Sequence, residues 1–162
     1  MSDMHQHIAY RRERYTEADI HNPLLLGLAT VEINPTELCN RTCSFCPRSD
    51  PEVYPNRKLH MTIELADILS EQLHKANFTG DIHTTGWGEP LLNPDILEII
   101  SKFSRYFFTE MISNGDRLLS KKISHKDLTA YGLDSIIVDC YDNPEQTMAC
   151  LLYTSDAADE SL

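Results

Sequence analysis

Cys39, Cys43 and Cys46 stand close together in the segment LCNRTCSFCPR, and they are three of the five cysteines in the chain. Thiolates at close spacing on one loop are typical ligands of iron–sulfur clusters. A cubane cluster has four irons, so three cysteines leave one iron open to another ligand. No fourth cysteine or histidine follows at close spacing. The alternative is a zinc ion completed by a distant residue such as His60 or Cys140, although structural zinc prefers two closely spaced pairs.

A second distinctive segment is GWGEP at residues 86–90, in which two glycines precede a carboxylate and a proline.

The segments that must position these residues alternate between strand and helix patterns. A helix that starts at Thr62 is indicated by an apolar stripe at Leu65, Leu69, Leu73 and Ala76. A second helix is predicted to begin with Asn93 as its N-cap and Pro94 in its first position. The expected strands are 29–35, 80–86, 107–113 and 135–140, and the expected helices are 62–77, 93–106 and 124–131.

This alternation predicts βαβ units and a parallel sheet, in which ligands gather at the carboxyl ends of the strands. The cysteine loop follows the first expected strand, and GWGEP follows the second. The third strand ends in Asn114-Gly115, a pair that is typical of a turn. We therefore expect these loops to share one edge of the sheet.

Composition limits the class of protein. The chain has 162 residues and a net charge of −11, which argues against an electrostatic nucleic-acid surface. Its longest apolar run, PLLLGLATV, is too short to cross a bilayer, and its polar N-terminus has no secretory signal. We expect a cytoplasmic protein with no membrane partner, in which cysteines serve as ligands rather than in disulfides.

The spacing Cys39-x3-Cys43-x2-Cys46 after a first strand, with the aromatic Phe45 before the last cysteine, resembles the signature of the radical S-adenosylmethionine (radical SAM) superfamily. GWGEP resembles the glycine–glutamate–proline loop that follows the second strand in that family. The resemblance implies that the three cysteines hold a 4Fe–4S cluster. Its fourth iron would be chelated by the amino and carboxylate groups of S-adenosylmethionine (SAM).

The same resemblance implies roles for other residues. Gly88 and Glu89 would receive the methionine amino group of SAM, and Gly86 would permit the turn. A carboxylate acceptor beside a glycine suits an ammonium, because the glycine lets the ligand approach closely. The backbone near Phe45 would lie along the adenine, and Asn114 would face the cosubstrate. Two further candidates for ribose contacts, at the end of the fourth strand, are Asp139 and Tyr141.

The activity implied is reductive cleavage of SAM to methionine and a 5′-deoxyadenosyl radical, which takes hydrogen from a substrate. An electron donor such as flavodoxin or ferredoxin would be a partner. The segments ELCNRTCSFCPR and GEPLLNPD resemble members that carry a further C-terminal cluster domain of the SPASM type, several of which modify peptides, so a peptide is one candidate substrate. The alternative of another class is a non-catalytic zinc or iron–sulfur module, for which a loop such as GWGEP has no purpose.

The resemblance covers only part of a family core. The family barrel has six βα units, whereas this chain has about three and a half, so the fold class expected is an incomplete parallel (β/α) barrel. We expect an N-terminal extension at 1–24, a truncated radical SAM core at 25–149 and a non-native tail at 150–162. That tail, CLLYTSDAADESL, resembles the translation of a transposase adapter used in sequencing libraries. The chain by itself is therefore expected to be an inactive fragment of a longer enzyme.

Overall fold

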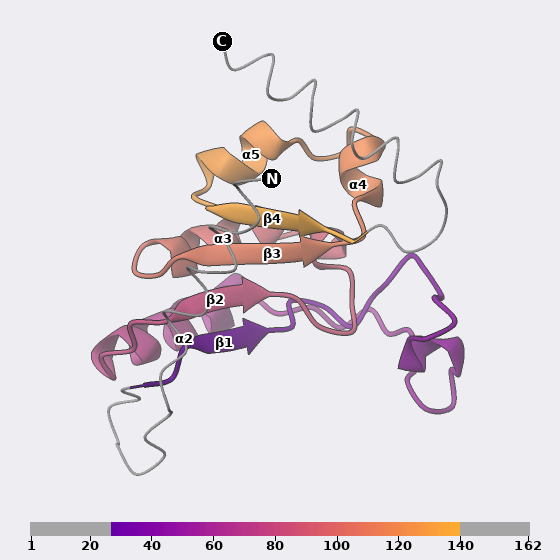
Figure 1. Ribbon diagram of the computed structural model, residues 1–162, viewed down its shortest axis with the longest axis horizontal. Helices are drawn as coiled ribbons and strands as arrows, with labels where there is room; N and C mark the ends of the chain where they lie inside the picture. Colours follow the sequence, from indigo (N-terminus) through magenta and orange to yellow (C-terminus); the bar gives the residue numbers. More distant parts are fainter. Residues whose placement is uncertain (1–26, 140–162) are drawn as a thin grey trace, which may run out of the picture.

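The computed structural model describes residues 27–139 as a parallel sheet with helices between its strands (Figure 1). The four strands lie in the order β1-β2-β3-β4, and each neighbouring pair is parallel. All four carboxyl ends therefore lie at one edge of the sheet. The elements are β1 Thr30–Ile33, η1 Pro47–Ser49, α2 Ile63–Lys75, β2 Asp81–Thr84, η2 Pro90–Leu92, α3 Ile96–Ser104, β3 Thr109–Ser113, α4 Asp116–Leu119, α5 His125–Ala130 and β4 Ser135–Val138.

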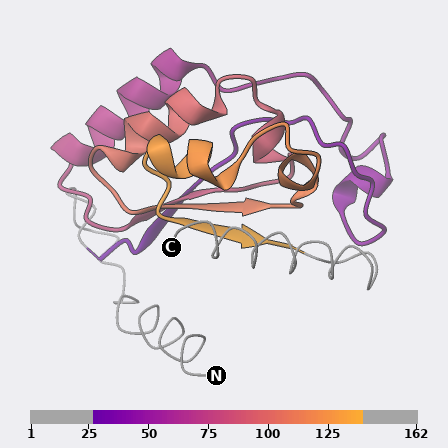
Figure 2. The same ribbon diagram turned by 90° about the horizontal axis from the view of Figure 1, so that it is seen from above.

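Helices α2, α3 and α5 lie on one face of the sheet (Figure 2). The core between sheet and helices forms two clusters of buried side chains, of which Ile99, Ile100 and Phe103 of α3 are fully buried. Burial of such apolar surface is the main force that holds the helices against the sheet. The first cluster comprises Ile33, Ala66, Leu73, Phe78, Ile82, Ile99, Phe103 and Phe107, and the second comprises Leu91, Ile96, Ile100, Met111, Leu118, Leu128 and Leu133.

The expected α/β architecture and its four parallel strands are confirmed, with each strand shorter than its predicted range. The helix expected from Thr62 is also confirmed, since the Thr62 side chain caps α2 by accepting from the Leu65 backbone amide at 3.2 Å. Two short elements, η1 and η2, and the single-turn helix α4 had no counterpart in the sequence prediction.

The apolar stripe predicted for α2 was partly wrong. Leu65 is 50% exposed, while Ala66 and Ser70 on the neighbouring positions are buried and Leu69 packs only in part against the core. The small side chains of Ala66 and Ser70 let α2 lie close to its neighbours. Leu73 is the one residue of the predicted stripe that is fully in the core.

Asn93 does not cap α3 as predicted. Helix α3 begins later, at Ile96, and Asp95 occupies the N-cap position. The Asn93 side chain is buried, and its Nδ2 donates to the backbone oxygens of Pro35 at 2.8 Å and Met61 at 3.0 Å. Its Oδ1 accepts from the Asp95 amide at 2.9 Å. Asn93 therefore joins the β2–α3 connection to the segments that follow β1 and precede α2.

The sheet face away from the helices has a row of polar residues in register. Glu32 on β1 pairs with His83 on β2, His83 pairs with Glu110 on β3, and Glu110 pairs with Ser135 on β4. The Glu110 side chain is buried; Ser135 Oγ donates to its Oε2 at 3.0 Å and His83 Nε2 lies 3.6 Å from its Oε1. Side chains alternate between the two faces along a strand, so this row shares its face with Thr85 and Ile112. The row lies two residues further from the carboxyl edge than Thr85 and Ile112 do.

The predicted extension at 1–24 and tail at 150–162 lie outside the described residues, as do Cys140 and Tyr141. Within residues 27–139, no helix has the length and apolar character needed to cross a membrane.

Candidate functional site

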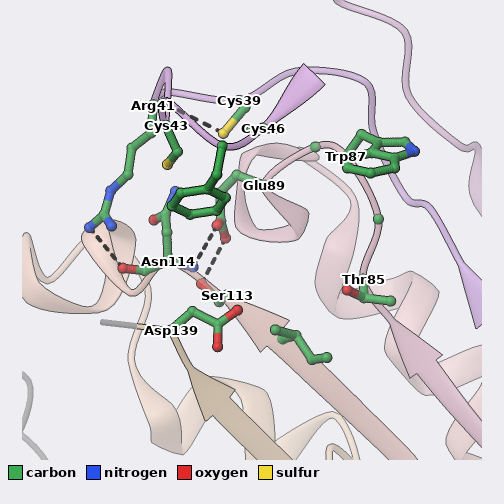
Figure 3. A pocket seen from close by; sticks show the side chains of 14 residues that line it. Cys39, Arg41, Cys43, Cys46, Thr85, Trp87, Glu89, Ser113, Asn114 and Asp139 are labelled. Carbon is green, nitrogen blue, oxygen red and sulfur yellow. Dashed lines mark hydrogen bonds between the residues drawn. The ribbon is translucent and has the colours of Figure 1, made fainter. Parts of the chain in front are cut away.

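A cavity of about 210 Å³ lies at the carboxyl edge of the sheet (Figure 3). All four strands contribute to it, through the loops after β1 and β2, the end of β3 and the residue that follows β4. Figure 3 shows the cysteine side chains at one end of the cavity and Asp139 at the other, with Glu89 between them. The lining residues are Cys39, Arg41, Cys43, Phe45, Cys46, Thr85, Gly86, Trp87, Gly88, Glu89, Ile112, Ser113, Asn114 and Asp139.

The three cysteines are brought together as predicted. Each is half-buried and lines the cavity, and none is in a disulfide bond. A tight turn shapes the loop, because the Cys46 amide donates to the Cys43 carbonyl at 3.0 Å and the Arg41 amide donates to Cys39 Sγ at 3.4 Å. Burial raises the pKa of Cys39 above its usual value, while the Arg41 hydrogen bond and the charge of Arg48 act in the opposite direction.

A polar network fastens the cysteine loop to the end of β3. Arg41 forms an ion pair with Asp116, with Nη2 at 2.5 Å from Oδ1 and Nε at 2.9 Å from Oδ2. Its Nη2 also donates to the Asn114 carbonyl at 2.9 Å. Asn40 donates to Asp116 Oδ2 at 2.6 Å and accepts from the Asn114 side chain at 3.0 Å. The loop therefore has a fixed place relative to β3, although more than 70 residues separate the partners.

Glu89 joins the β2 loop to the end of β3. It is almost fully buried, and its Oε1 accepts from Ser113 Oγ at 2.7 Å and from the Leu91 amide at 3.1 Å. Its Oε2 accepts from the Asn114 amide at 2.9 Å. Burial raises the pKa of Glu89 above its usual value, and the three hydrogen bonds oppose that rise. A carboxylate offers about four lone-pair sites, so one further donor can be accommodated.

Gly86 and Gly88 are needed for close packing of the loops that follow β1 and β2. Gly86 has a φ of 119°, a conformation that side chains rarely adopt, which agrees with its predicted turn. A Cβ atom at Gly88 would lie 1.8 Å from the Thr36 carbonyl oxygen. The Gly88 position is therefore explained by contact with the loop after β1, and this contact brings Glu89 beside the cysteines.

Asn114 is both a turn residue and part of the cavity wall. Its Oδ1 accepts from the Asp116 amide at 3.1 Å, and Gly115 after it has a φ of 78°. The turn is therefore present, and the expected contact between Asn114 and the cosubstrate stays a prediction. Phe45 and Trp87 are exposed aromatic side chains that line the cavity, and Asp139 lines its opposite end.

The donor set of the cavity fits a 4Fe–4S cluster better than zinc. His60, the histidine considered as a fourth zinc ligand, does not line the cavity, and its Nδ1 is 2.8 Å from Thr36 Oγ1. Within residues 27–139, no three His, Cys, Asp or Glu side chains converge on a single metal ion. In a cubane each thiolate binds a different iron, so the sulfurs need not converge. Three cysteines facing one cavity match that requirement.

A family model described as "Radical SAM superfamily" matches residues 33–139, about two thirds of the chain. The chain belongs to the radical SAM superfamily. Its members use a 4Fe–4S cluster and SAM, so the expected cofactors and the expected class of enzyme are confirmed at the level of the family. The matched range begins at the end of β1 and includes the three cysteines and GWGEP.

Individual relatives agree with this assignment. The chain is 32% identical over 117 residues to an S-adenosyl-L-methionine-dependent 2-deoxy-scyllo-inosamine dehydrogenase from Niallia circulans, covering 70% of this chain and 44% of that protein. The crystal structure of BtrN in complex with AdoMet and 2-DOIA superposes with a TM-score of 0.61 at 27% identity, covering 74% of this chain and 49% of that one. BtrN in an open conformation gives a TM-score of 0.58 at 27% identity, covering 73% and 52%. The chain thus spans about half the length of these relatives, and the partial radical SAM barrel is confirmed.

Sequence reasoning missed the side chains that hold the loops in place. Arg41, Arg48, Asn56, Ser113 and Asp116 were not identified as part of the site, although each bonds directly to a loop that lines it. One usable signal was present, because Arg41 and Arg48 lie within and directly after the cysteine motif. Their partners could not be found without the fold.

Proposed function

We propose that this chain carries the cofactor-binding half of a radical SAM enzyme that oxidises a small hydroxylated substrate by hydrogen abstraction. When bound, the 4Fe–4S cluster supplies the electron that breaks the carbon–sulfur bond of SAM. The observation that supports the proposal best is that Cys39, Cys43 and Cys46 face the same cavity as Gly88 and Glu89. The two motifs of the family are therefore assembled in this chain, at the edge where parallel strands end.

The residues of the chain would bind and orient the cofactors. The three cysteines would hold the cluster as thiolates, and Glu89 would accept one more hydrogen bond, from the methionine ammonium of SAM. The backbone near Phe45 would lie along the adenine. Asn114, on the far side of Glu89, would face the cosubstrate, and Asp139 would be near the ribose. Packing of the loops excludes water from Glu89, which strengthens its attraction for a cation.

The substrate type is inferred from relatives and from the sheet. The relative from Niallia circulans is named for the oxidation of 2-deoxy-scyllo-inosamine, a name that denotes hydroxyl groups and an amine. The polar row of Glu32, His83, Glu110 and Ser135 lies on the face that a closed barrel would enclose, and it offers hydrogen-bonding groups of the kind that suit such a molecule. These observations favour a small polyhydroxylated amine over the peptide considered from the sequence.

Oxidation of a C–H bond next to a hydroxyl requires removal of one hydrogen atom, one proton and one further electron. The hydrogen atom would go to the 5′-deoxyadenosyl radical and the proton to a base. The further electron would return to the cluster that SAM cleavage had oxidised, so a turnover would consume no net electron. A low-potential donor such as flavodoxin or ferredoxin in the cytoplasm would supply the electron that starts the cycle.

The test has two arms. In the first, SAM is titrated into the anaerobically reconstituted and reduced chain, and the electron paramagnetic resonance signal of the cluster is followed. The proposal expects the signal to change in a saturable way; an intact cluster that ignores SAM would refute it. In the second, a protein extending this chain to the length of its relatives is given substrate deuterated at the carbinol carbon. Deuterium in 5′-deoxyadenosine would support alcohol oxidation, whereas deuterium transfer only from a peptide would refute the substrate type.

A further inference from the structure

Arg48 is a buried cation directly beside the cysteine loop. It lies in η1, two residues after Cys46, and is only 6% exposed. Its guanidinium reaches three separate segments: Nη2 donates to the Glu37 carbonyl, Nε donates to the Trp87 carbonyl, and Nη1 donates to Asn56 Oδ1 at 3.0 Å. Arg48 therefore ties the exit of β1, the GWGEP loop and the connector before α2 to one point.

None of these three acceptors carries a charge. Among residues 27–139 no carboxylate forms an ion pair with Arg48, and the ring of Tyr54 lies under its guanidinium at 4.9 Å. The two other arginines of the same region differ in this respect. Arg41 is paired with Asp116, and Arg57 is paired with Glu37 at 2.7 Å. A buried charge without a counter-ion is costly to hold, so an anion close by would stabilise it.

The cysteine ligands of the neighbouring loop are candidates for that anion. Asn56 connects Arg48 to Cys39, because its Oδ1 also accepts from the Cys39 amide at 2.9 Å and its Nδ2 donates to the Cys39 carbonyl at 2.9 Å. A 4Fe–4S cluster with three thiolates has a net negative charge that grows by one on reduction. The positive charge of Arg48 would favour the more negative state.

We propose that Arg48 is the counter-charge of the cluster, and that it raises the reduction potential of the cluster in addition to positioning the three loops. This inference rests on the proposed function, because it requires the cluster to be bound. It assigns to Arg48 an electrostatic role that hydrogen bonding alone would not give. A lysine in its place would keep the charge and lose the fork of donors, whereas a methionine would lose both.

The experiment compares Arg48→Lys and Arg48→Met in the full chain, reconstituted without oxygen. Each protein is titrated with a reductant in the presence of redox mediators, and the reduced cluster is measured by electron paramagnetic resonance. We expect Arg48→Met to shift the midpoint to a more negative potential. The expected fall in the ratio of reduced to oxidised cluster at the wild-type midpoint is about threefold or more, which is about 30 mV for a one-electron couple. Arg48→Lys should stay near the wild-type midpoint. Arg57→Met removes one positive charge from a side chain that is 61% exposed, so it serves as the matched control and should leave the potential unchanged.

A second measurement covers the case in which the methionine variant binds iron poorly. Arg48→Ala is titrated with guanidinium or with urea at equal low concentrations, because both restore hydrogen-bond donors and only guanidinium restores the charge. Recovery of the midpoint with guanidinium alone supports the proposal. Equal potentials in wild type and Arg48→Met, equal rescue by urea, or equal loss of the cluster from the lysine and methionine variants would each overturn it and leave Arg48 as a structural clamp. A wild-type chain that binds no iron and sulfide would instead refute the proposed function.

Discussion

Replacement of Glu89 by glutamine tests how the β2 loop is joined to β3. The carboxylate accepts three hydrogen bonds, from Ser113 Oγ at 2.7 Å, the Asn114 amide at 2.9 Å and the Leu91 amide at 3.1 Å. Glutamine keeps the shape of the side chain but has only one acceptor oxygen. Its NH2 group must therefore face at least one of these three donors, which then loses its hydrogen bond. An unsatisfied buried polar group costs about 1–3 kcal/mol. Relief of the buried charge offsets part of this, and we expect a net loss of about 1–2 kcal/mol at pH 7.

The assay is thermal unfolding followed by circular dichroism. For a chain of this length the expected loss corresponds to a fall of about 2–8 °C in the melting temperature. Ser113→Ala is the matched control, because it removes one donor and keeps the Glu89 charge. It should also lower the melting temperature.

The pH dependence gives the sharper result. Because burial raises the folded-state pKa of Glu89 above its unfolded value, its contribution to stability is fully present below the unfolded pKa and is lost as the pH rises through the folded pKa. The stability gap between wild type and Glu89→Gln should therefore be larger near pH 5 than near pH 8. Ser113→Ala should retain the wild-type trend. A gap that grows with rising pH, or a variant as stable as wild type throughout, would refute this account of Glu89.

Three further predictions follow from the loops and helix ends. Gly88→Ala places a Cβ 1.8 Å from the Thr36 carbonyl oxygen, so it should separate the two loops and abolish SAM binding measured by calorimetry; near-normal affinity would contradict the packing. Ser124 caps α5, because its Oγ accepts from the Asp127 backbone amide at 3.1 Å. Ser124→Ala should therefore lower the free energy of unfolding in urea by about 1 kcal/mol, and an unchanged value would contradict the cap. Asp116→Asn weakens the ion pair with Arg41 at the cysteine loop and should speed the loss of iron to a chelator, whereas an unchanged rate would show that the pair does not anchor the loop.

Much of the site could be predicted because topology does the positioning. The four strands are short, β-branched segments separated by helices, and this order alone predicts a parallel sheet whose loops meet at one edge. The cysteines and Glu89 therefore share a cavity, although 50 residues separate Cys39 from Glu89. Local chemistry was also informative at Thr62, where a hydroxyl side chain before an apolar pattern does cap the helix.

Errors arose where distant partners override a local preference. Asn93-Pro94 has the local pattern of a helix start, but the Asn93 amide instead bonds the Pro35 and Met61 carbonyls, which the sequence cannot place beside it. Arg41 pairs with Asp116, which is 75 residues away in the sequence, so no local pattern predicts the pair. Leu65 fits a helical stripe by spacing, but the face that α2 presents to the sheet is set by packing of its small residues.

The most direct test of the central claim is the metal content of the reconstituted chain. Without oxygen, the chain should bind about four irons and about four sulfides and show the broad visible absorption of a thiolate-bound cluster. Alanine in place of Cys39, Cys43 or Cys46 should abolish both, whereas Ser44→Ala in the same loop and Cys140→Ala should not. Stoichiometric zinc without sulfide, or a full cluster in the three cysteine variants, would contradict the assignment.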